Sequence, residues 1–286
     1  MSLTGDAGLS ASRRSRVRNT RRLASHALLW TLSALTLLPF LWMVLASFKV
    51  RSEVEQINPI PTVWHPENYL RVFQQVAFAR YYFNSVFIAG WVTALQCLTS
   101  SMAAYAFARM RWPGRDLVFK LYLTTLMVPG VVTMIPNFVL MVKMHLLDSY
   151  VGLIVPAAFS AFGTFLLRQF MLTLPRALDE AAMLDGATHW QTFWNVCMPL
   201  ARPGLITLAV FTFMGTYGSF TWPLVMIKSE GLRTLPLGMM YFDSVYGRQT
   251  ELIMAASVMN IIPLIVLFVV TQKHLVEGIQ LGGVKG

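Results

Sequence analysis

Three acidic residues, Asp179, Glu180 and Asp185, gather in a polar segment of residues 174–204 that lies between two long apolar stretches. Asp179 and Glu180 fall in the first turn of a predicted short helix, where the helix dipole stabilises negative charge. The sequence offers no paired-carboxylate pattern that predicts acid–base catalysis. The chemistry expected of this segment is therefore recognition, in which a short helix enters a groove on another protein.

The same predicted helix carries a small apolar face, formed by Ala177, Ala181 and Leu184 at positions i, i+4 and i+7. Gly186 is expected to end the helix, because glycine readily adopts the left-handed conformation found at helix C-termini. The alternative is an amphipathic helix on the membrane surface, but such helices carry Lys and Arg on their polar face. Arg176 alone opposes the acids here, so docking on a protein is favoured.

A second short helix is predicted directly after the first. Thr188 and Gln191 have the spacing of a capping box at a helix N-terminus, and Pro199 is expected to end the helix. A stripe at helical spacing is expected to pack against the rest of the protein: Trp190, Phe193, Trp194 and Cys197. The segment is thus predicted to form a helix–turn–helix.

Several other kinds of chemistry lack a motif. The sequence has no G-x-x-x-x-G-K-[ST] phosphate loop, so the chain is not expected to hydrolyse ATP by itself. Its five histidines are scattered without metal-ligand spacing, and Cys97 and Cys197 are isolated, so no metal or cofactor is expected and both thiols are assigned to packing. No catalytic constellation indicates an enzyme, and no apolar stretch carries the central acid that proton-coupled transporters need.

The composition indicates the kind of element that must position the polar segment. Of the 286 residues, 56% are hydrophobic and only 13% are charged, whereas soluble domains carry roughly 25% charge. An ordinary soluble enzyme is therefore excluded, as is a disordered chain. Six apolar stretches are long enough to cross a bilayer: about 27–48, 85–108, 117–141, 151–170, 204–226 and 252–271. The fold class predicted is an all-α membrane protein with six transmembrane helices.

The predicted organisation places these spans within five regions. They are an unstructured basic tail (1–26), a first span (27–48), an extracytoplasmic loop (49–83), a core that contains segment 174–204 (84–275) and a C-terminal tail (276–286). With the amino terminus in the cytoplasm, 15 Lys and Arg residues lie inside and 8 outside, while the acids divide almost evenly. Both termini are therefore predicted to be cytoplasmic. The net charge of +10 then reflects orientation and lipid contact, without a nucleic-acid partner.

Helix breakers recur in the last four predicted spans. They include Pro129-Gly130 and Pro136 in the third span, and Pro156, Pro223 and Pro263 in the next three. In lipid, neighbouring helices or a wet cavity must satisfy a broken backbone. The breaks indicate a bundle that bends or lines a path, and ordinary packing is the alternative.

One run of small and acidic residues has a specific spacing: Glu180, Ala181, Ala182, Asp185, Gly186, Ala187 and, further on, Pro199. This spacing resembles the EAA loop of the permease subunits of ABC importers. Asn84-Ser85, residues 104–109 and the tail 282–286 are similar to carbohydrate-uptake permeases, especially the maltose-type second permease subunit. The likeness covers nearly the whole chain after residue 26, and it implies the type I ABC-importer permease fold.

The resemblance also implies the partners. They would be a second homologous permease chain, an ATPase dimer that binds ATP and magnesium, and an extracytoplasmic binding protein that delivers a sugar. In that family the EAA helix docks on the ATPase, and the C-terminal tail, here Lys285 and Gly286, also reaches it. The outer loop at about 228–250 would approach the binding protein. The location implied is the cytoplasmic membrane of a prokaryote.

The fifth predicted span departs from the family pattern. The family commonly has Trp-Asn-acid-Phe, whereas residues 217–220 here read Tyr-Gly-Ser-Phe. Aromatic and amide side chains suit a sugar path, because rings stack on sugars and amides bind hydroxyls. The residues predicted for such a path, with helix packing as the alternative, are Asn137, Phe213, Tyr217, Phe220 and Asn260.

Two other functions stay open at this stage. The same architecture could import a glycerol-phosphate-type or other polar non-sugar solute. An ion-coupled secondary transporter would need an ion site inside the membrane, and the spans offer none.

Overall fold

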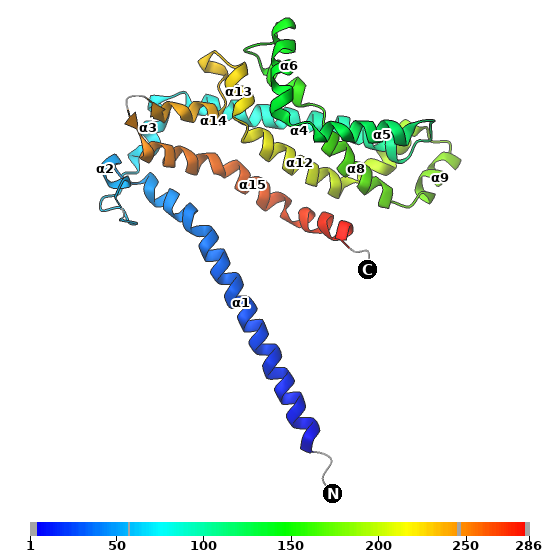
Figure 1. The fold of residues 1–286 in the computed structure, drawn as a ribbon, viewed down its shortest axis with the longest axis horizontal. Coiled ribbons are helices and arrows are strands. Elements are labelled where there is room, and N and C mark those ends of the chain that lie inside the picture. The colour runs from blue at the N-terminus through cyan, green and yellow to red at the C-terminus, as the bar shows by residue number, and fades with distance from the viewer. Residues whose placement is uncertain (1–4, 57, 245–246, 284–286) are drawn as a thin grey trace. The chain divides into compact units, whose positions relative to one another are not determined.

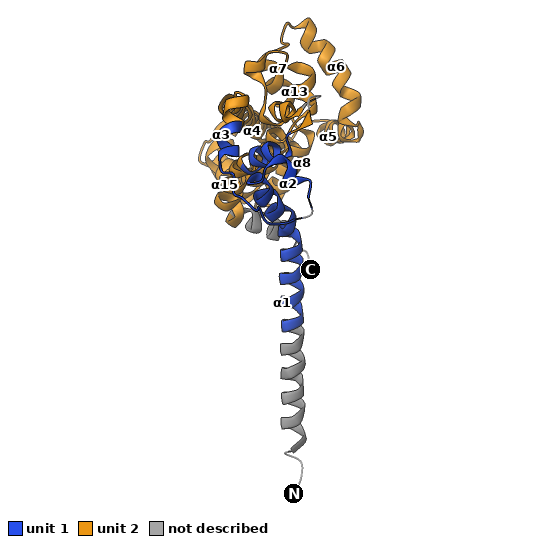
Figure 2. Ribbon diagram, turned by 90° about the vertical axis from the view of Figure 1, so that its left-hand side faces the viewer, with its two compact units in different colours: residues 1–71, 249–258 blue, residues 72–248, 259–286 orange. Residues whose placement is uncertain are grey.

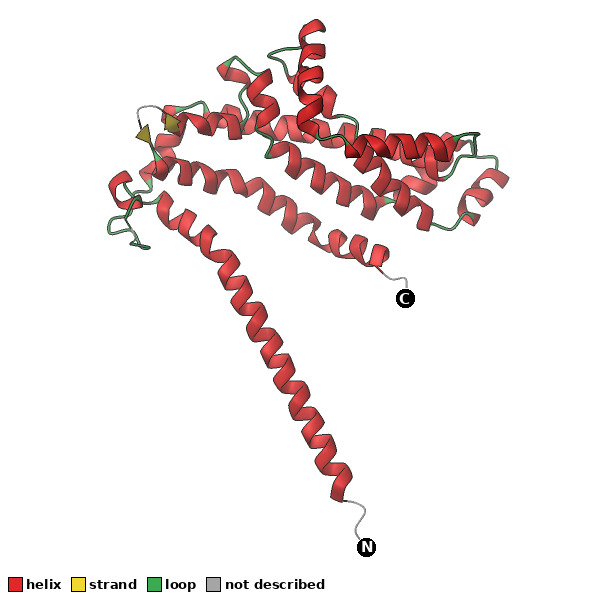
Figure 3. Ribbon diagram, in the orientation of Figure 1, coloured by secondary structure: helices red, strands yellow, loops and turns green. Residues whose placement is uncertain are grey.

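The computed structural model describes residues 5–56, 58–244 and 247–283. Figure 3 shows that most of this part of the chain is helical. The chain divides into two compact units (Figure 2): residues 1–71 with 249–258, and residues 72–248 with 259–286.

The first unit begins with a long helix, α1 (Gly5–Ser47), which contains Pro39. The expectation of an unstructured tail is wrong for residues 5–26, since the helix starts at Gly5. Arg, Leu and Ala favour helix, and adding residues to an existing helix is much easier than starting one. The apolar part, Arg22–Ser47, is long enough to cross a membrane.

The segment after α1 is ordered rather than an open loop. It contains α2 (Arg51–Val54) and α3 (Glu67–Gln75). The side-chain amide of Asn68 donates to the backbone oxygens of Ser47 and Lys49, at 3.0 and 2.8 Å. These bonds fasten α3 to the end of the first span.

The second unit is built around α4 (Phe78–Ala108), which packs against α8 (Ala161–Thr173) and α12 (Arg202–Tyr217), as Figure 1 shows. Small residues allow the close approach. A Cβ atom at Gly163 of α8 would lie 2.6 Å from the Ser100 hydroxyl of α4.

Between α4 and α8 the chain forms a series of shorter elements. These are α5 (Arg115–Thr124), η1 (Thr125–Met127), α6 (Gly130–Lys143), α7 (Tyr150–Ile154) and η2 (Val155–Ala157). After α12 come α13 (Thr221–Met226), η4 (Glu230–Leu232), α14 (Leu235–Met239), η5 (Met240–Phe242), the antiparallel strands β1 (Asp243–Ser244) and β2 (Gly247–Arg248), and α15 (Thr250–Gly283).

The structure contains helices at the predicted spans, but several of these spans are bent or broken. Among the described residues, three helices are long and apolar enough to cross a membrane, or up to six spans result if each of three bent helix pairs counts as one. The predicted third span bends by 98° at Pro129-Gly130, and the fourth by 44° between η2 and α8. The predicted fifth span is wrong at its end, because α12 stops at Tyr217 and a separate α13 follows.

Candidate functional site

The acidic segment forms the predicted first helix, α9 (Ala177–Leu184). Gly186 ends it with a backbone φ of +84°, as expected. The amide of Gly186 donates to the Met183 oxygen at 3.1 Å, and the amide of Ala187 donates to the Ala182 oxygen at 2.9 Å. This pair of bonds is the Schellman arrangement, which satisfies the last carbonyl groups of the helix.

The residues predicted to dock on a partner lie together on α9 and its cap. Glu180, Ala181, Asp185 and Gly186 are exposed, whereas Ala182 and Ala187 are half-buried. The apolar face is open as well, and the side chain of Leu184 at its end is 89% exposed. An apolar face that stays uncovered beside carboxylates suits contact with another protein.

Asp179 behaves differently from its two acidic neighbours. It is 9% exposed, and its carboxylate forms an ion pair with Arg109 at 3.2 Å. The Cys197 thiol donates to the other carboxylate oxygen at 3.5 Å. Of the three acids in the predicted docking segment, Asp179 therefore faces the protein.

The second part of the segment starts with the predicted capping box. The Gln191 amide donates to the Thr188 hydroxyl, and the Gln191 side chain accepts from the Thr188 amide, at the start of α10 (His189–Thr192). A π-helix, η3 (Phe193–Cys197), and α11 (Met198–Leu200) follow. Pro199 is exposed and lies in α11, and the helical stretch ends one residue later, at Leu200, close to the predicted end.

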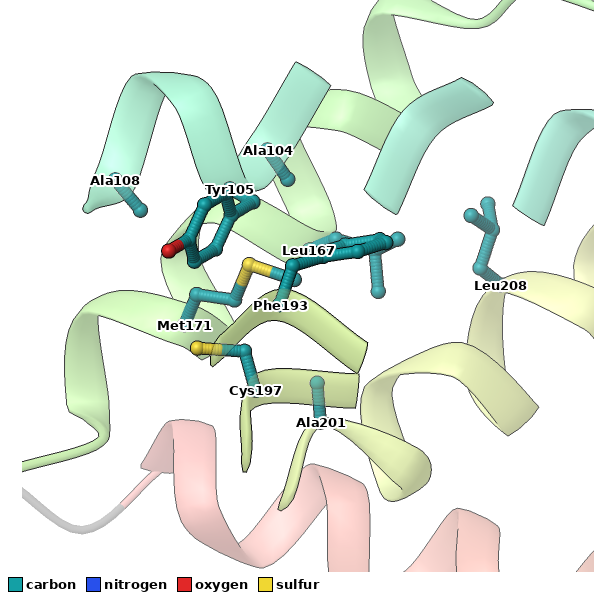
Figure 4. Close-up of a cluster of buried hydrophobic side chains, with 9 residues drawn as sticks. All are labelled: Ala104, Tyr105, Ala108, Leu167, Met171, Phe193, Cys197, Ala201 and Leu208. Carbon is teal, nitrogen blue, oxygen red and sulfur yellow. The ribbon is translucent and has the colours of Figure 1, made fainter. Parts of the chain in front are cut away.

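Half of the predicted aromatic stripe packs inward. Figure 4 shows Phe193 and Cys197 in a buried cluster with Tyr105 of α4 and Met171 of α8. The rings of Phe193 and Tyr105 meet edge to face, with centroids 5.4 Å apart. Trp190 and Trp194 are 56% and 40% exposed, so the prediction that they pack inward is wrong. The π-helix changes the angular spacing of residues 193–197, so the predicted α-helical stripe does not describe this segment.

The residues predicted for a sugar path do not form one surface. Phe213 and Tyr217 stack with centroids 5.7 Å apart, and the Tyr217 hydroxyl donates to the Asn260 backbone oxygen at 3.0 Å. Tyr217 is buried, which fits the packing alternative in this conformation. Phe220 is exposed at the break between α12 and α13.

Asn137 lines a separate cavity of about 250 Å³. Polar side chains gather around it: Ser85, Thr216, Ser219 and Thr234. The Trp222 ring also lines the cavity, and the buried Thr234 hydroxyl has no hydrogen-bond partner among the described residues. Sequence reasoning missed these four small residues, since single Ser and Thr residues in apolar stretches give no periodic signal.

Near the N-terminus of α4, hydrogen bonds from Asn84 hold the segment that contains η4, and we call this set of bonds the Asn84 clamp. The Asn84 side-chain amide donates to the backbone oxygens of Gly231 and Arg233 at 3.0 and 2.8 Å. Its oxygen accepts from the Tyr150 hydroxyl at 2.7 Å. The Ser85 hydroxyl accepts from the Leu235 amide at 2.7 Å, so Asn84-Ser85 holds this loop directly.

Known proteins resemble the chain along most of its length. Residues 96–273 match the family of binding-protein-dependent transport system inner membrane components. The arabinooligosaccharides transport permease AraQ of Halalkalibacterium halodurans is 34% identical over 279 residues, covering 93% of this chain and all of the relative. The diacetylchitobiose uptake permease NgcG of Streptomyces coelicolor is 32% identical, covering 90% of this chain and 87% of the relative.

A solved structure has the same fold. A chain from the crystal structure of a bacterial ABC transporter that imports the acidic polysaccharide alginate superposes with a TM-score of 0.79 at 24% identity. The match covers 91% of this chain and 98% of that chain. The chain thus has the fold of an ABC-importer permease, is a multi-pass membrane protein, and belongs to the family of binding-protein-dependent transport system inner membrane components.

Proposed function

We propose that the chain is one of two permease subunits of an ATP-driven importer that takes up an oligosaccharide or disaccharide across the cytoplasmic membrane of a prokaryote. The family gives the permease role. The substrate class is supported by the printed names of its relatives, which carry arabinooligosaccharides and diacetylchitobiose. Import of a glycerol-phosphate-type or other polar solute through the same architecture is the rival proposal.

The observation that carries the coupling role is the exposed surface of α9. Glu180, Ala181, Asp185 and Gly186 point away from the protein beside an uncovered apolar face. We assign this surface to docking on a separate ATPase chain that binds ATP and magnesium. Lys285 and Gly286, proposed to reach the same ATPase, lie outside the described residues.

The proposed mechanism is mechanical. Closure of the ATPase dimer around ATP moves the surface on which α9 rests, and the permease shifts toward the outward-facing state. The free energy for this shift comes from the different affinity of the ATPase for ATP in the two states. The binding protein then releases sugar toward the membrane, close to the loop held by Asn84.

The 250 Å³ cavity is the best candidate for contact with the sugar in this chain. Its small hydroxyl side chains can pair with sugar hydroxyls, and the Trp222 ring offers an apolar face. The predicted residue Asn137 belongs to this group. Phe213, Tyr217, Phe220 and Asn260 stay predictions for the path in another conformation.

A docking experiment tests the coupling role. In the whole transporter, Glu180→Lys should reverse the charge of the docking surface and prevent co-purification of the ATPase chain, with loss of uptake. Glu55→Lys is the matched control, because Glu55 is an exposed acid in the first unit. Normal assembly and uptake in Glu180→Lys would contradict the docking role of α9.

A binding experiment tests the substrate class. The partner binding protein should bind an oligosaccharide or disaccharide in a calorimetric screen, and the same sugar should stimulate ATP hydrolysis by the assembled transporter. Binding of glycerol phosphate without binding of any sugar would favour the rival proposal.

A further inference from the structure

The attachment of α9 to the rest of the second unit depends on one charged residue. Among the eight residues of α9, Asp179 is the buried one and Ala182 is half-buried, while the other side chains are exposed. A short helix with so little buried apolar surface gains little orientation from packing. Its direction must therefore depend on the contacts of the Asp179 carboxylate.

The Asp179 carboxylate and the Arg109 guanidinium together join four segments of the chain. Arg109 caps the C-terminus of α4. One guanidinium nitrogen lies 3.2 Å from the Asp179 carboxylate, and another donates to the backbone oxygen of Leu174, just after α8, at 3.0 Å. The second carboxylate oxygen of Asp179 accepts from the Cys197 thiol of η3.

The ion pair between Arg109 and Asp179 is buried, so breaking it should cost more free energy than breaking an exposed pair. The side chains of Arg109 and Asp179 are only 4% and 12% exposed. Removing one partner of a buried pair leaves an uncompensated charge, whereas an exposed pair contributes little. The pairs that Asp116 forms with Arg115 and Arg168 are more open, since the Asp116 side chain is 65% exposed.

The planar guanidinium of Arg109 fixes both the distance and the relative orientation of the groups that it binds. Arginine presents its donors in a rigid fork, so two simultaneous bonds define the orientation of the groups that accept them. The Arg109 guanidinium binds a carboxylate of α9 and a carbonyl group at the end of α8 at the same time. A displacement of α9 therefore acts on the end of α4 through this group.

We propose that Arg109 and Asp179 are positioning residues that transmit the movement of α9 to α4 and thereby couple ATP hydrolysis to transport. The proposal rests on the proposed docking of α9 on the ATPase chain. Neither residue touches ATP or sugar in this scheme. Their role is to make α9 and α4 move together when the ATPase dimer closes.

The test is the number of sugar molecules taken up per ATP hydrolysed by the whole transporter in proteoliposomes, with its binding protein. Asp179→Asn keeps the size of the side chain and removes its charge, and Arg109→Lys keeps the charge and removes the fork. In both variants this ratio should fall by about tenfold, within the range typical of coupling between sites, while the ATPase chain still co-purifies. Glu55→Gln, at an exposed acid of the first unit, should leave the ratio unchanged.

Two results would overturn the proposal. One is a variant that assembles and transports with the native ratio. The other is loss of assembly in both variants, since the pair would then only maintain the fold. Glu180→Lys separates this proposal from the docking role: its normal assembly contradicts docking, whereas a native ratio in Asp179→Asn contradicts the transmission role alone.

Discussion

At the scale of single residues, local chemistry decides where α9 ends and which way its acids face. Gly186 adopts a left-handed backbone that other residues adopt only at a cost, so its position was predictable from the sequence alone. The inward direction of Asp179 was not predictable, because its partner, Arg109, lies 70 positions earlier in the chain. Spacing along one helix cannot reveal a partner on another helix.

Replacing Gly186 tests the helix cap. Gly186→Ala should destabilise the end of α9 by about 1–2 kcal/mol, the cost of a left-handed conformation for an L-residue. Amide exchange over residues 177–187 should accelerate, and affinity for the ATPase chain should fall. Gly90→Ala is the control, because a Cβ atom there meets open space within α4. Equal behaviour of the two variants would exclude a special role for the cap.

Replacing Thr234 tests the cavity. Thr234→Val keeps the shape and removes a buried hydroxyl that has no partner among the described residues. If sugar binds there, KM for uptake should rise about fivefold, the effect of losing one hydrogen bond worth about 1 kcal/mol. Thr212→Val is the control, because that hydroxyl bonds to Gln96. An unchanged KM in Thr234→Val would separate the cavity from the sugar path.

At the scale of elements, only some of the predicted breaks occur, because α6 and α15 continue through Pro136 and Pro263. Pro129-Gly130 marked the interruption of the third span, but the 98° bend depends on packing that the sequence does not display. The capping box at Thr188 and Gln191 was recognisable from two residues. The π-helix after it, which contains Trp194, was not.

The clamp between α4 and the η4 segment gives a prediction at this scale. Asn84→Leu removes three hydrogen bonds, a loss of about 3 kcal/mol at roughly 1 kcal/mol each. Amides in residues 230–235 should exchange faster, and stimulation of ATP hydrolysis by the binding protein should fall. Asn195→Leu, at an exposed position, is the control. Native exchange in Asn84→Leu would show that other contacts hold the segment.

The Asp148 carboxylate holds the start of the same loop, and the strength of this attachment should depend on pH in a predictable direction. The backbone amides of Ser229 and Lys228 donate to its carboxylate at 3.0 and 2.9 Å, and they lower the pKa of Asp148 below its ordinary value. The contribution of Asp148 to stability is therefore complete at pH values above its ordinary pKa. It is lost as pH falls through the lower pKa of the folded state.

Exchange of the Lys228 and Ser229 amides, corrected for intrinsic rates, should thus stay constant from neutral pH down to about pH 5. In Asp148→Ala these amides should exchange faster than in the native protein from neutral pH down to about pH 5, where the Asp148 carboxylate of the native protein is charged. A rise in the corrected rate of the native protein near neutral pH would contradict the assignment.

At the scale of the whole molecule, composition and charge predicted a helical membrane protein and a direction in the membrane. The family and the fold agree with the prediction of a helical membrane protein. The direction is testable with cysteines at the exposed positions Arg111 and Lys228. An impermeant thiol reagent should label Arg111→Cys only from the cytoplasmic side and Lys228→Cys only from outside. The reverse pattern would invert the predicted topology, and native Cys97 and Cys197 are half-buried and buried.

The uninterrupted course of α4 has a mechanical consequence. Its 31 residues span about 46 Å at 1.5 Å per residue, more than the roughly 30 Å thickness of the hydrocarbon layer. It holds the Asn84 clamp near one end, and Arg109 caps the other. A continuous, stiff helix that tilts about its middle moves its two ends in opposite directions, so a displacement of α4 at one membrane face also displaces it at the other. The two faces of the transporter therefore cannot rearrange independently of each other.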